Sequence, residues 1–105
     1  MRLYRHVDLV HGVAWQDAWA RALGDAAGVV PVCVERSDRA ERLDAFVHPA
    51  DALYVFGPED GGVPKGARHA CHRFVCIPTV NDGPLNLAAA VNVVLYDRLA
   101  KAAAG

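Results

Sequence analysis

A glycine-rich loop in the segment YVFGPEDGGVPKG, residues 54–66, carries two carboxylates directly after an apolar run. Gly57 and Gly62 have the G-x-x-x-x-G spacing of a phosphate-binding loop, but valine and proline follow where lysine and serine or threonine are required. Glu59 and Asp60 would also repel a polyphosphate, and the dinucleotide fingerprint G-x-G-x-x-G is absent. The loop therefore argues against a nucleotide triphosphate site. Two interpretations remain open: a site for a ligand with a neutral or cationic face, which glycines allow the backbone to approach, or a tight turn with solvated acids.

A basic segment follows this loop. Five basic side chains and no acid occupy residues 65–73, namely Lys65, Arg68, His69, His72 and Arg73. If the segment is helical, the first four of these side chains fall on one face. Such a face would suit the phosphates of RNA, and the alternative is a helix face that is simply solvated.

The segment IPTVNDGPLNLAAAVNVVLY, residues 77–96, predicts a turn followed by a long helix. Pro84 fits the first helical position, and the Asp-Gly pair before it would cap the helix. The first helical turns are apolar almost all round, so we expect this helix to be buried on more than one side. Asn86 and Asn92 interrupt the apolar surface, and as buried polar groups each should find a partner in a loop or in another subunit.

The cysteines and histidines do not form a recognisable metal motif. The run HACHRFVC, residues 69–76, contains two of each, but its spacing matches no common zinc pattern, so we expect no metal. The three cysteines, Cys33, Cys71 and Cys76, are odd in number and lie in apolar or strand-like stretches. We interpret them as buried, reduced thiols in a reducing compartment.

The composition describes one globular domain. The chain has 105 residues, of which 53% are hydrophobic and 22% charged. No apolar run is long enough to span a bilayer and no signal-peptide pattern occurs, so a cytoplasmic protein with no membrane partner is expected. The formal net charge of −1 gives no general attraction to nucleic acid, so RNA binding would need a local basic patch.

Apolar runs alternate with helical patterns along the chain. The predicted strands are residues 2–10, 29–35, 52–57 and 74–79, and the predicted helices are residues 15–26, residues 65–73 and a long last helix. Gly28 should end the first helix, and the charged connection at residues 36–51 should contain at most one helical turn. Pro31 favours an edge position or a strand start for the second strand.

This alternation predicts an α/β domain over residues 1–105 with a mainly parallel sheet. Ligands of such sheets bind beyond the carboxyl ends of the strands. Three such ends lie at Val34 to Arg36, at the glycine loop after Phe56, and at the turn after Ile77. The sequence therefore places its candidate ligand site where these loops meet.

Two motifs in the right order resemble the SpoU-like branch of the SPOUT RNA methyltransferases. Residues 53–64, LYVFGPEDGGVP, look like its second motif, and residues 77–96 look like its third motif, I-P followed by S-L-N-x-S-x-A and a helix. The upstream segment YRHVDLVHGVAWQDAWA is similar, more loosely, to the small single-domain members that methylate the ribose of the tRNA wobble nucleotide. The matching positions are Phe56, Gly57, Glu59, Gly62 and Pro64 in the second motif, and Ile77, Pro78, Leu85, Asn86, Ala90 and Tyr96 in the third.

The resemblance implies a parallel-sheet domain, shortened at its amino end, with a carboxyl-terminal trefoil knot that binds S-adenosylmethionine. It also implies a homodimer that pairs through the knotted region and the last helix, with RNA, and tRNA in particular, as substrate. By matching positions, the cofactor residues would be Val34, Gly57, Glu59, Gly62, Ile77, Pro84, Leu85 and Asn86. Lys65, Arg68 and Arg73 would hold RNA phosphate.

The chain departs from the family pattern at two places. The family's first motif, an asparagine and an arginine that help to activate the ribose hydroxyl, is not found, and Pro84 and Ala88 replace serines of the third motif. Arg5, Arg36 or a partner chain would then have to supply the missing catalytic group. The resemblance leaves three hypotheses open. The first is an S-adenosylmethionine-dependent RNA ribose 2′-O-methyltransferase, and the second is a shortened, non-catalytic dimer that binds cofactor or RNA or partners a complete enzyme. The third is that the gene begins upstream and encodes the missing strands there.

Overall fold

Five parallel strands form one sheet in the computed structural model, which describes residues 4–10, 13–24, 27–58, 62–79 and 86–104. Across the sheet the order is β1 (Tyr4–Asp8), β4 (Ala52–Phe56), β2 (Val30–Val34), β5 (Arg73–Cys76) and β3 (Glu41–Arg42). Each strand pairs in parallel with its neighbours. The predicted α/β class with a parallel sheet is therefore confirmed.

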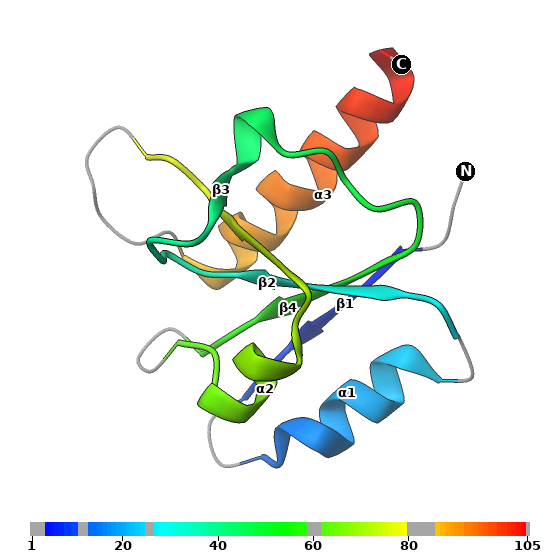
Figure 1. Ribbon diagram of the computed structural model, residues 1–105, viewed down its shortest axis with the longest axis vertical. Helices are drawn as coiled ribbons and strands as arrows, with labels where there is room; N and C mark the ends of the chain where they lie inside the picture. The colour runs from blue at the N-terminus through cyan, green and yellow to red at the C-terminus, as the bar shows by residue number, and fades with distance from the viewer. Residues whose placement is uncertain (1–3, 11–12, 25–26, 59–61, 80–85, 105) are drawn as a thin grey trace.

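Helices cover both faces of this sheet (Figure 1). The helices α1 (Trp15–Leu23) and α2 (Lys65–Ala70) lie on one face, and the helix α3 (Leu87–Ala104) lies on the other with the 3₁₀ turn η1 (Leu43–Ala45). Two apolar clusters result, one on each face. Because both faces are covered, all five residues of β4 are buried, which explains why this strand reads as an unbroken apolar run.

The strand β2 also lies inside the sheet, between β4 and β5. The edge position suggested by its proline is therefore wrong, and the strand-start alternative is correct. Pro31 is the second residue of β2, and pairing with β5 begins only at Val32. A residue without an N–H is tolerated there because the ladder on that side has not yet started.

Several predicted boundaries are corrected by the structure. The helix α1 ends at Leu23, and its cap is Gly24 rather than Gly28, with φ +58° and an N–H that donates to the Ala20 carbonyl at 2.9 Å. The connection at residues 36–51 holds the short strand β3 as well as η1. A two-residue strand is too short to leave an alternation that sequence reasoning can recognise.

The start of α3 differs from the prediction as well. The helix begins at Leu87, and the side-chain oxygen of Asn86 accepts a hydrogen bond from the Ala89 N–H at 3.2 Å, so Asn86 is its cap. Asn86 and Asn92 are both exposed, not buried as expected. The predicted roles of residues 82–84 and the chain path that would form the knot fall within residues 80–85, which lie outside the described residues, so the knot stays a prediction.

Only Val94 and Arg98 of α3 are buried. Val93, Tyr96 and Leu99 remain exposed, with 70% of Tyr96 accessible. The expectation that this apolar helix is buried on more than one side is therefore not met within a single chain. Its uncovered side is an apolar face of the kind that marks an interface.

Three further expectations concern the cysteines, metal binding and membrane spans. Cys33 and Cys71 are buried free thiols, whereas Cys76 is half-buried. Across the described residues, no group of three or more histidine, cysteine, aspartate or glutamate side chains could hold a metal ion. In the same part of the chain, no helix combines the length and apolar character needed to cross a bilayer.

Candidate active site at the carboxyl edge of the sheet

Three predicted cofactor positions come together at the carboxyl edge of the sheet. Val34, the last residue of β2, lies opposite Phe56 of β4 on one side and Val75 of β5 on the other. Gly57, which follows β4, therefore lies on one side of the end of β2, and Ile77, which follows β5, lies on its other side. The loops after β2, β4 and β5 thus meet at one edge, which is where parallel sheets bind ligands.

The glycine loop folds back on its own start. A Cβ atom on Gly57 would lie 2.3 Å from the Gly62 carbonyl carbon and 2.4 Å from the Val63 nitrogen, so only glycine fits there. The Gly62 N–H donates to the Pro58 carbonyl at 3.1 Å, and Gly62 has φ +67°. Both glycines are therefore needed to close the loop. The sequence alone could not distinguish this role from close approach of the backbone to a ligand. Glu59 lies outside the described residues.

Glu35 was missed by sequence reasoning, although it follows Val34 directly. Its Oε1 atom accepts a hydrogen bond from the Val63 N–H at 3.0 Å. Its Oε2 atom is buried and has no hydrogen-bond partner among the described residues; the nearest cation, Arg68 Nη1, lies 3.6 Å away, within ion-pair range but too far for a hydrogen bond. The only available sequence signal was an acid at the end of a buried strand.

A hollow of 450 Å³ opens beside these strand ends. It is lined by Arg36, Ser37, Asp38, Arg42, Cys76, Ile77, Pro78 and Thr79. The hollow brings Ile77, a predicted cofactor residue, to the same wall as Arg36, a catalytic candidate. A volume in this range suits a small-molecule ligand.

The second catalytic candidate lies elsewhere. Arg5 is the second residue of β1 and pairs with Leu53, near the amino ends of the strands. Its Nη1 donates to the Ala22 carbonyl at 3.0 Å, at the end of α1. Of the two arginines proposed from sequence, only Arg36 lies at the edge where the three loops meet.

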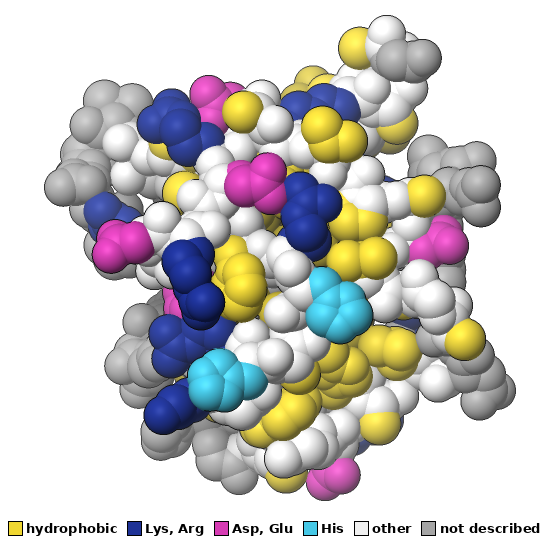
Figure 2. All heavy atoms as spheres, viewed as in Figure 1, with side chains coloured by type: hydrophobic (Ala, Val, Ile, Leu, Met, Phe, Trp, Pro, Cys, Tyr) yellow, Lys and Arg dark blue, Asp and Glu magenta, His cyan; other side chains and the backbone are white. Residues whose placement is uncertain are grey.

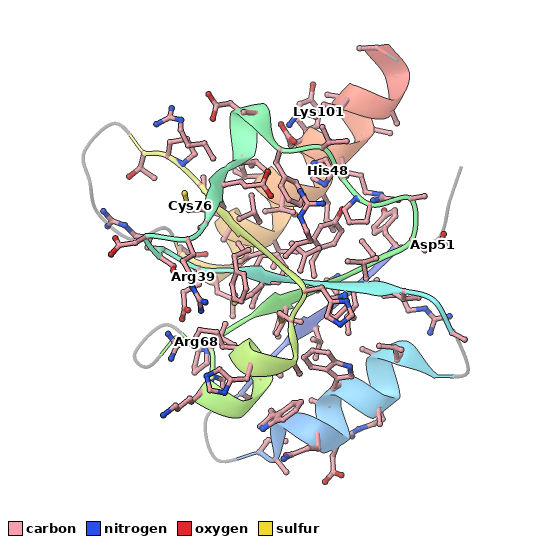
Figure 3. All side chains as sticks on the ribbon, viewed as in Figure 1. Arg39, His48, Asp51, Arg68, Cys76 and Lys101 are labelled. Atoms are coloured by element: carbon pink, nitrogen blue, oxygen red, sulfur yellow. The ribbon has the colours of Figure 1, made fainter. Side chains whose placement is uncertain are left out.

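Basic side chains gather along one side of the molecule, over the region of α2 and β3 (Figure 2). Arg39 and Arg68 lie at the same end of the sheet, opposite Asp51 (Figure 3). Arg39 stacks over the Phe74 ring with its guanidinium carbon 5.3 Å from the ring centroid. This arginine was not among the predicted RNA contacts, because it is far in sequence from residues 65–73.

The predicted RNA residues differ in how strongly they are already paired. Arg73 forms an ion pair with Glu41 at 2.6 Å and covers the Phe46 ring, so its charge is largely occupied. Lys65 is exposed at the start of α2. His72 lies beyond the end of α2. The expectation that it shares one helical face with Lys65, Arg68 and His69 is therefore wrong for His72.

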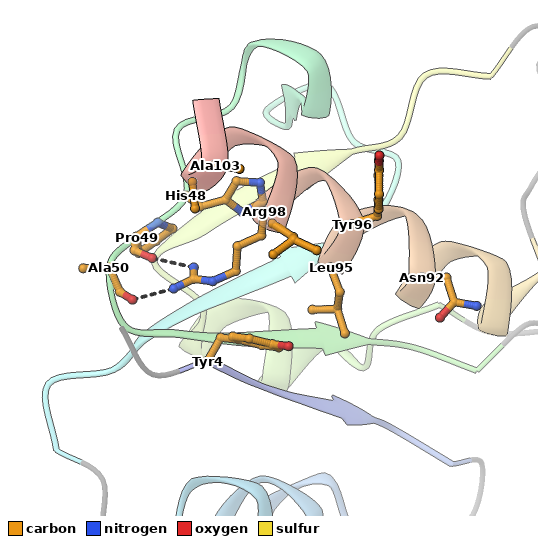
Figure 4. Close-up of a pocket in the computed structure, with 11 residues that line it drawn as sticks. Tyr4, His48, Pro49, Ala50, Asn92, Leu95, Tyr96, Arg98 and Ala103 are labelled. Atoms are coloured by element: carbon orange, nitrogen blue, oxygen red, sulfur yellow. Dashed lines mark hydrogen bonds between the residues drawn. The ribbon is translucent and has the colours of Figure 1, made fainter. Parts of the chain in front are cut away.

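A second polar cluster lies beneath α3, away from this edge. Arg98 donates to the carbonyls of Pro49 at 2.7 Å and Ala50 at 2.6 Å (Figure 4). It also donates to the Tyr54 hydroxyl at 2.9 Å. His48 bridges Tyr54 and Asp97 at 2.7 Å on each side. Since the Asp97 carboxylate accepts from His48 Nε2, the neutral ring accepts from Tyr54 at Nδ1.

Titration in this cluster follows from its burial. Burial lowers the pKa of His48 below its ordinary value, against the opposing effect of Asp97. Burial also raises the pKa of Tyr54, whose hydroxyl therefore stays protonated. These groups tie α3 to the loop before β4, a structural role.

The buried thiol of Cys33 is unsuited to chemistry. A hydrogen bond with Cys71, together with burial, raises the pKa of Cys33 far above its ordinary value. A thiol that stays protonated is a poor nucleophile and a poor metal ligand. Cys33 is therefore not a candidate for catalysis.

The fold and the edge define a class: an α/β protein with a parallel sheet, whose candidate ligand site lies where the loops after β2, β4 and β5 meet. A family model described as the SpoU rRNA Methylase family matches residues 3–96, and the chain belongs to this family. A comparison with curated proteins finds no match.

Solved structures of SpoU methyltransferases share this fold. The SpoU methyltransferase AviRb from Streptomyces viridochromogenes, in complex with the cofactor AdoMet, is 22% identical with a TM-score of 0.67, over 87% of this chain and 35% of that one. A structure that concerns the 2′-OH methylation of C/U34 on tRNA is 28% identical with a TM-score of 0.64, over 86% of this chain and 57% of that one. A probable methylase family protein from Haemophilus influenzae is 22% identical with a TM-score of 0.58, over 77% and 39%. The chain therefore spans only about a third to three fifths of the length of these proteins.

The residues at the carboxyl edge fit S-adenosylmethionine, the cofactor of SpoU methyltransferases. The sulfonium of that molecule carries a positive charge, and Glu35 places a buried carboxylate oxygen without a hydrogen-bond partner among the described residues at this edge, with Arg68 3.6 Å away. The hollow beside Ile77 offers space, and Arg36 and Ser37, which follow β2, line it. Arg36 and Arg42 line the hollow with exposed side chains, so neither holds a buried charge against a cationic ligand.

Proposed function

We propose that the chain forms the S-adenosylmethionine-binding part of an RNA ribose 2′-O-methyltransferase that acts on tRNA in the cytoplasm. The observation that carries this proposal is the convergence of Val34, Gly57 and Ile77 at one edge of the sheet. Membership of the SpoU family and the 28% identity to a protein of tRNA 2′-OH methylation support it.

The cofactor supplies an electrophilic methyl group when it is bound. The work of the protein is then to place that methyl in line with a ribose hydroxyl and to exclude water. Gly57 and the backbone after Val34 and Ile77 would hold the cofactor, with the predicted residues Glu59, Pro84 and Leu85 from the segments that complete the loops. Arg36 lines the hollow beside Ile77 and would stabilise charge on the attacking oxygen or contact the RNA phosphate next to it.

The basic side of the molecule provides the RNA contacts. Among the described residues, neither Lys65 nor Arg39 forms an ion pair with an acid. Lys65 begins the helix α2 that carries Arg68, and Arg39 lies at the same end of the sheet as Arg68 (Figure 3). We assign phosphate binding to Lys65 and Arg68, with Arg39 in addition. Arg73 contributes less, because Glu41 already neutralises it.

A homodimer through α3 belongs to the same proposal. The exposed side chains of Val93, Tyr96 and Leu99 form an apolar face, and a groove of 810 Å³ continues it along the helix between Tyr4 and the segment at residues 48–50 (Figure 4). A second copy would cover this face through the same residues, as twofold interfaces do.

The test separates binding from turnover. Purified protein is titrated with S-adenosylmethionine in a calorimeter and then incubated with methyl-labelled cofactor and bulk tRNA, with Arg36→Ala as the variant and Arg21→Ala on α1 as the control. We expect binding in all three proteins and ribose methylation that is lost only in Arg36→Ala. No heat and no thermal shift at millimolar cofactor would refute the proposal, because a specific ligand must stabilise the folded state.

The position of Arg5 favours a second candidate function. Arg5 is held by the Ala22 carbonyl away from the carboxyl edge, and the first family motif is not found in the sequence. The chain would then bind cofactor or RNA without turnover, or partner a complete methyltransferase. Cofactor binding without any label transfer to tRNA would select this alternative.

A further inference from the structure

We propose that Glu35 is a positioning residue that joins the two halves of the site: one carboxylate oxygen fixes the glycine loop of the cofactor half, and the other holds Arg68 of the RNA half. The inference rests on the proposed function and goes beyond it. No motif of the family pattern quoted from the sequence contains this residue, which the structure alone brings into the site.

The contact with the glycine loop is specific. Glu35 Oε1 accepts from the Val63 N–H at 3.0 Å, and a Cβ on Gly62 would lie 2.8 Å from the same oxygen. A backbone N–H bonded to an ionised carboxylate is among the stronger hydrogen bonds in proteins. The carboxylate thus fixes the end of the loop whose start, Gly57, packs against Gly62 and Val63.

The contact with Arg68 is loose by comparison. The Arg68 guanidinium lies 3.6 Å from Glu35 Oε2, without a hydrogen bond, and its side chain is 40% exposed while that of Glu35 is only 18% exposed. The arginine is therefore attracted to the strand ends but keeps its donors available. A phosphate at the edge can take those donors without first breaking a hydrogen bond.

Glu35 is well anchored for this role. Its backbone N–H donates to the Val75 carbonyl at 3.0 Å, so the residue continues the ladder between β2 and β5. A side chain carried directly at the end of an inner strand, with its backbone bonded to the next strand, holds its partners more precisely than a residue farther along a loop can. The Glu35 carboxylate therefore connects the glycine loop of the proposed cofactor site to Arg68 of the proposed RNA site.

Two substitutions separate these contacts. Glu35→Gln keeps an oxygen that can accept from Val63 but removes the charge that attracts Arg68, whereas Glu35→Ala removes both. Asp51→Asn is the matched control, because it also removes one carboxylate charge but lies at the opposite end of the sheet from Arg68 (Figure 3). Calorimetry with S-adenosylhomocysteine measures cofactor affinity, and fluorescence anisotropy with labelled tRNA measures RNA affinity. Amide hydrogen exchange of Val63, without any ligand, measures the hydrogen bond between Val63 and Glu35.

The expected results differ for each variant. Glu35→Gln should keep cofactor affinity within about threefold and bind tRNA about two- to fivefold more tightly, since the partly exposed ion pair with Arg68, worth up to about 1 kcal/mol, no longer competes with phosphate. Its dependence of log Kd on log salt should steepen by about one unit, as expected for one more available cation. Glu35→Ala should lose at least about tenfold in cofactor affinity, the cost of one charge-assisted hydrogen bond, and should lose protection at the Val63 amide.

Some results would overturn the inference. Unchanged cofactor affinity in Glu35→Ala, or weaker tRNA binding in Glu35→Gln, would do so while leaving the proposed function intact. If the Val63 amide loses protection but neither ligand affinity changes, the hydrogen bond from Val63 to Glu35 has a purely structural role, and the inference is overturned as well. Wild-type protein that binds neither ligand would overturn the proposed function first. If Glu35→Ala does not fold, Glu35→Asp replaces it, because the shorter side chain keeps the charge but cannot reach Val63, and it should show the same loss of cofactor affinity.

Discussion

Removal of one hydroxyl, in Tyr54→Phe, tests the physical account of how α3 is fixed to the sheet. Tyr54 is fully buried in β4, and its hydroxyl accepts from Arg98 and donates to His48. Phenylalanine has nearly the same shape and fills the same space, so packing is preserved. The substitution therefore isolates the polar contribution of this single atom.

The magnitude follows from the groups that would be left without partners. His48 Nδ1 loses its donor, the Tyr54 hydroxyl, and a buried group left unpaired costs about 1–3 kcal/mol. Arg98 keeps the carbonyls of Pro49 and Ala50, so its own loss is small. We expect the free energy of unfolding to fall by about 2 kcal/mol, which lowers Tm by about 10 °C in a domain of this size.

Chemical denaturation at pH 7.5, read by far-ultraviolet circular dichroism, measures this change. Tyr96→Phe is the matched control, since it removes the same kind of hydroxyl from a position on α3 that is 70% exposed. The control should change stability by less than about 0.5 kcal/mol. A loss below that value in Tyr54→Phe itself would refute the assignment of Tyr54 as the donor to His48, and with it the account of the network.

Three further predictions follow from the same contacts. The pKa of His48 lies below its ordinary 6.5 in the folded chain, so the unfolded chain binds the extra proton more readily. The stabilisation should be complete above about pH 6.5 and should fall as the pH drops below that value, and Tyr54→Phe should lose part of this pH dependence. A flat profile of Tm from about pH 7.5 to 5 would contradict the assignment. Gly57→Ala should weaken binding of S-adenosylhomocysteine at least about tenfold, because its Cβ would collide with backbone 2.3 Å away. Gly28→Ala is the control: its φ of +78° strains the backbone, but its Cβ meets nothing within 4 Å, so stability should fall while that affinity stays unchanged in calorimetry. Equal affinities in the two variants would show that the loop tolerates rearrangement. Leu99→Glu should convert a dimer into a monomer in light scattering, and a monomeric wild type would refute the proposed interface.

The sequence predicted where chemistry was possible but not what each group does there. The runs that became β2, β4 and β5 were found because buried parallel strands need continuous apolar residues. The glycine loop was found because its spacing is unusual, and its acids excluded polyphosphates. The sequence could not show that Gly57 and Gly62 pack against each other, because the two glycines touch only through the path of the loop between them.

The basic side chains make the same point about partners. From sequence, Lys65, Arg68 and Arg73 were equivalent candidates for RNA. The structure distinguishes them, since Glu41 on the edge strand β3 neutralises Arg73 whereas Arg68 keeps its donors. β3 was itself missed, because two residues carry no periodic pattern, so the partner of Arg73 could not be anticipated.

Local properties of the chain thus came from sequence: element types, the absence of a polyphosphate loop, and the family to which the motifs belong. Long-range properties came from the tertiary structure: the strand order, the meeting of three loops at one edge, the reach of Glu35 to Val63, and the cluster of His48, Tyr54 and Arg98. The physical reason is that backbone propensity and apolar periodicity act between neighbours in sequence. Hydrogen bonds and ion pairs depend instead on side chains from distant segments, whose positions are decided only when the sheet is assembled.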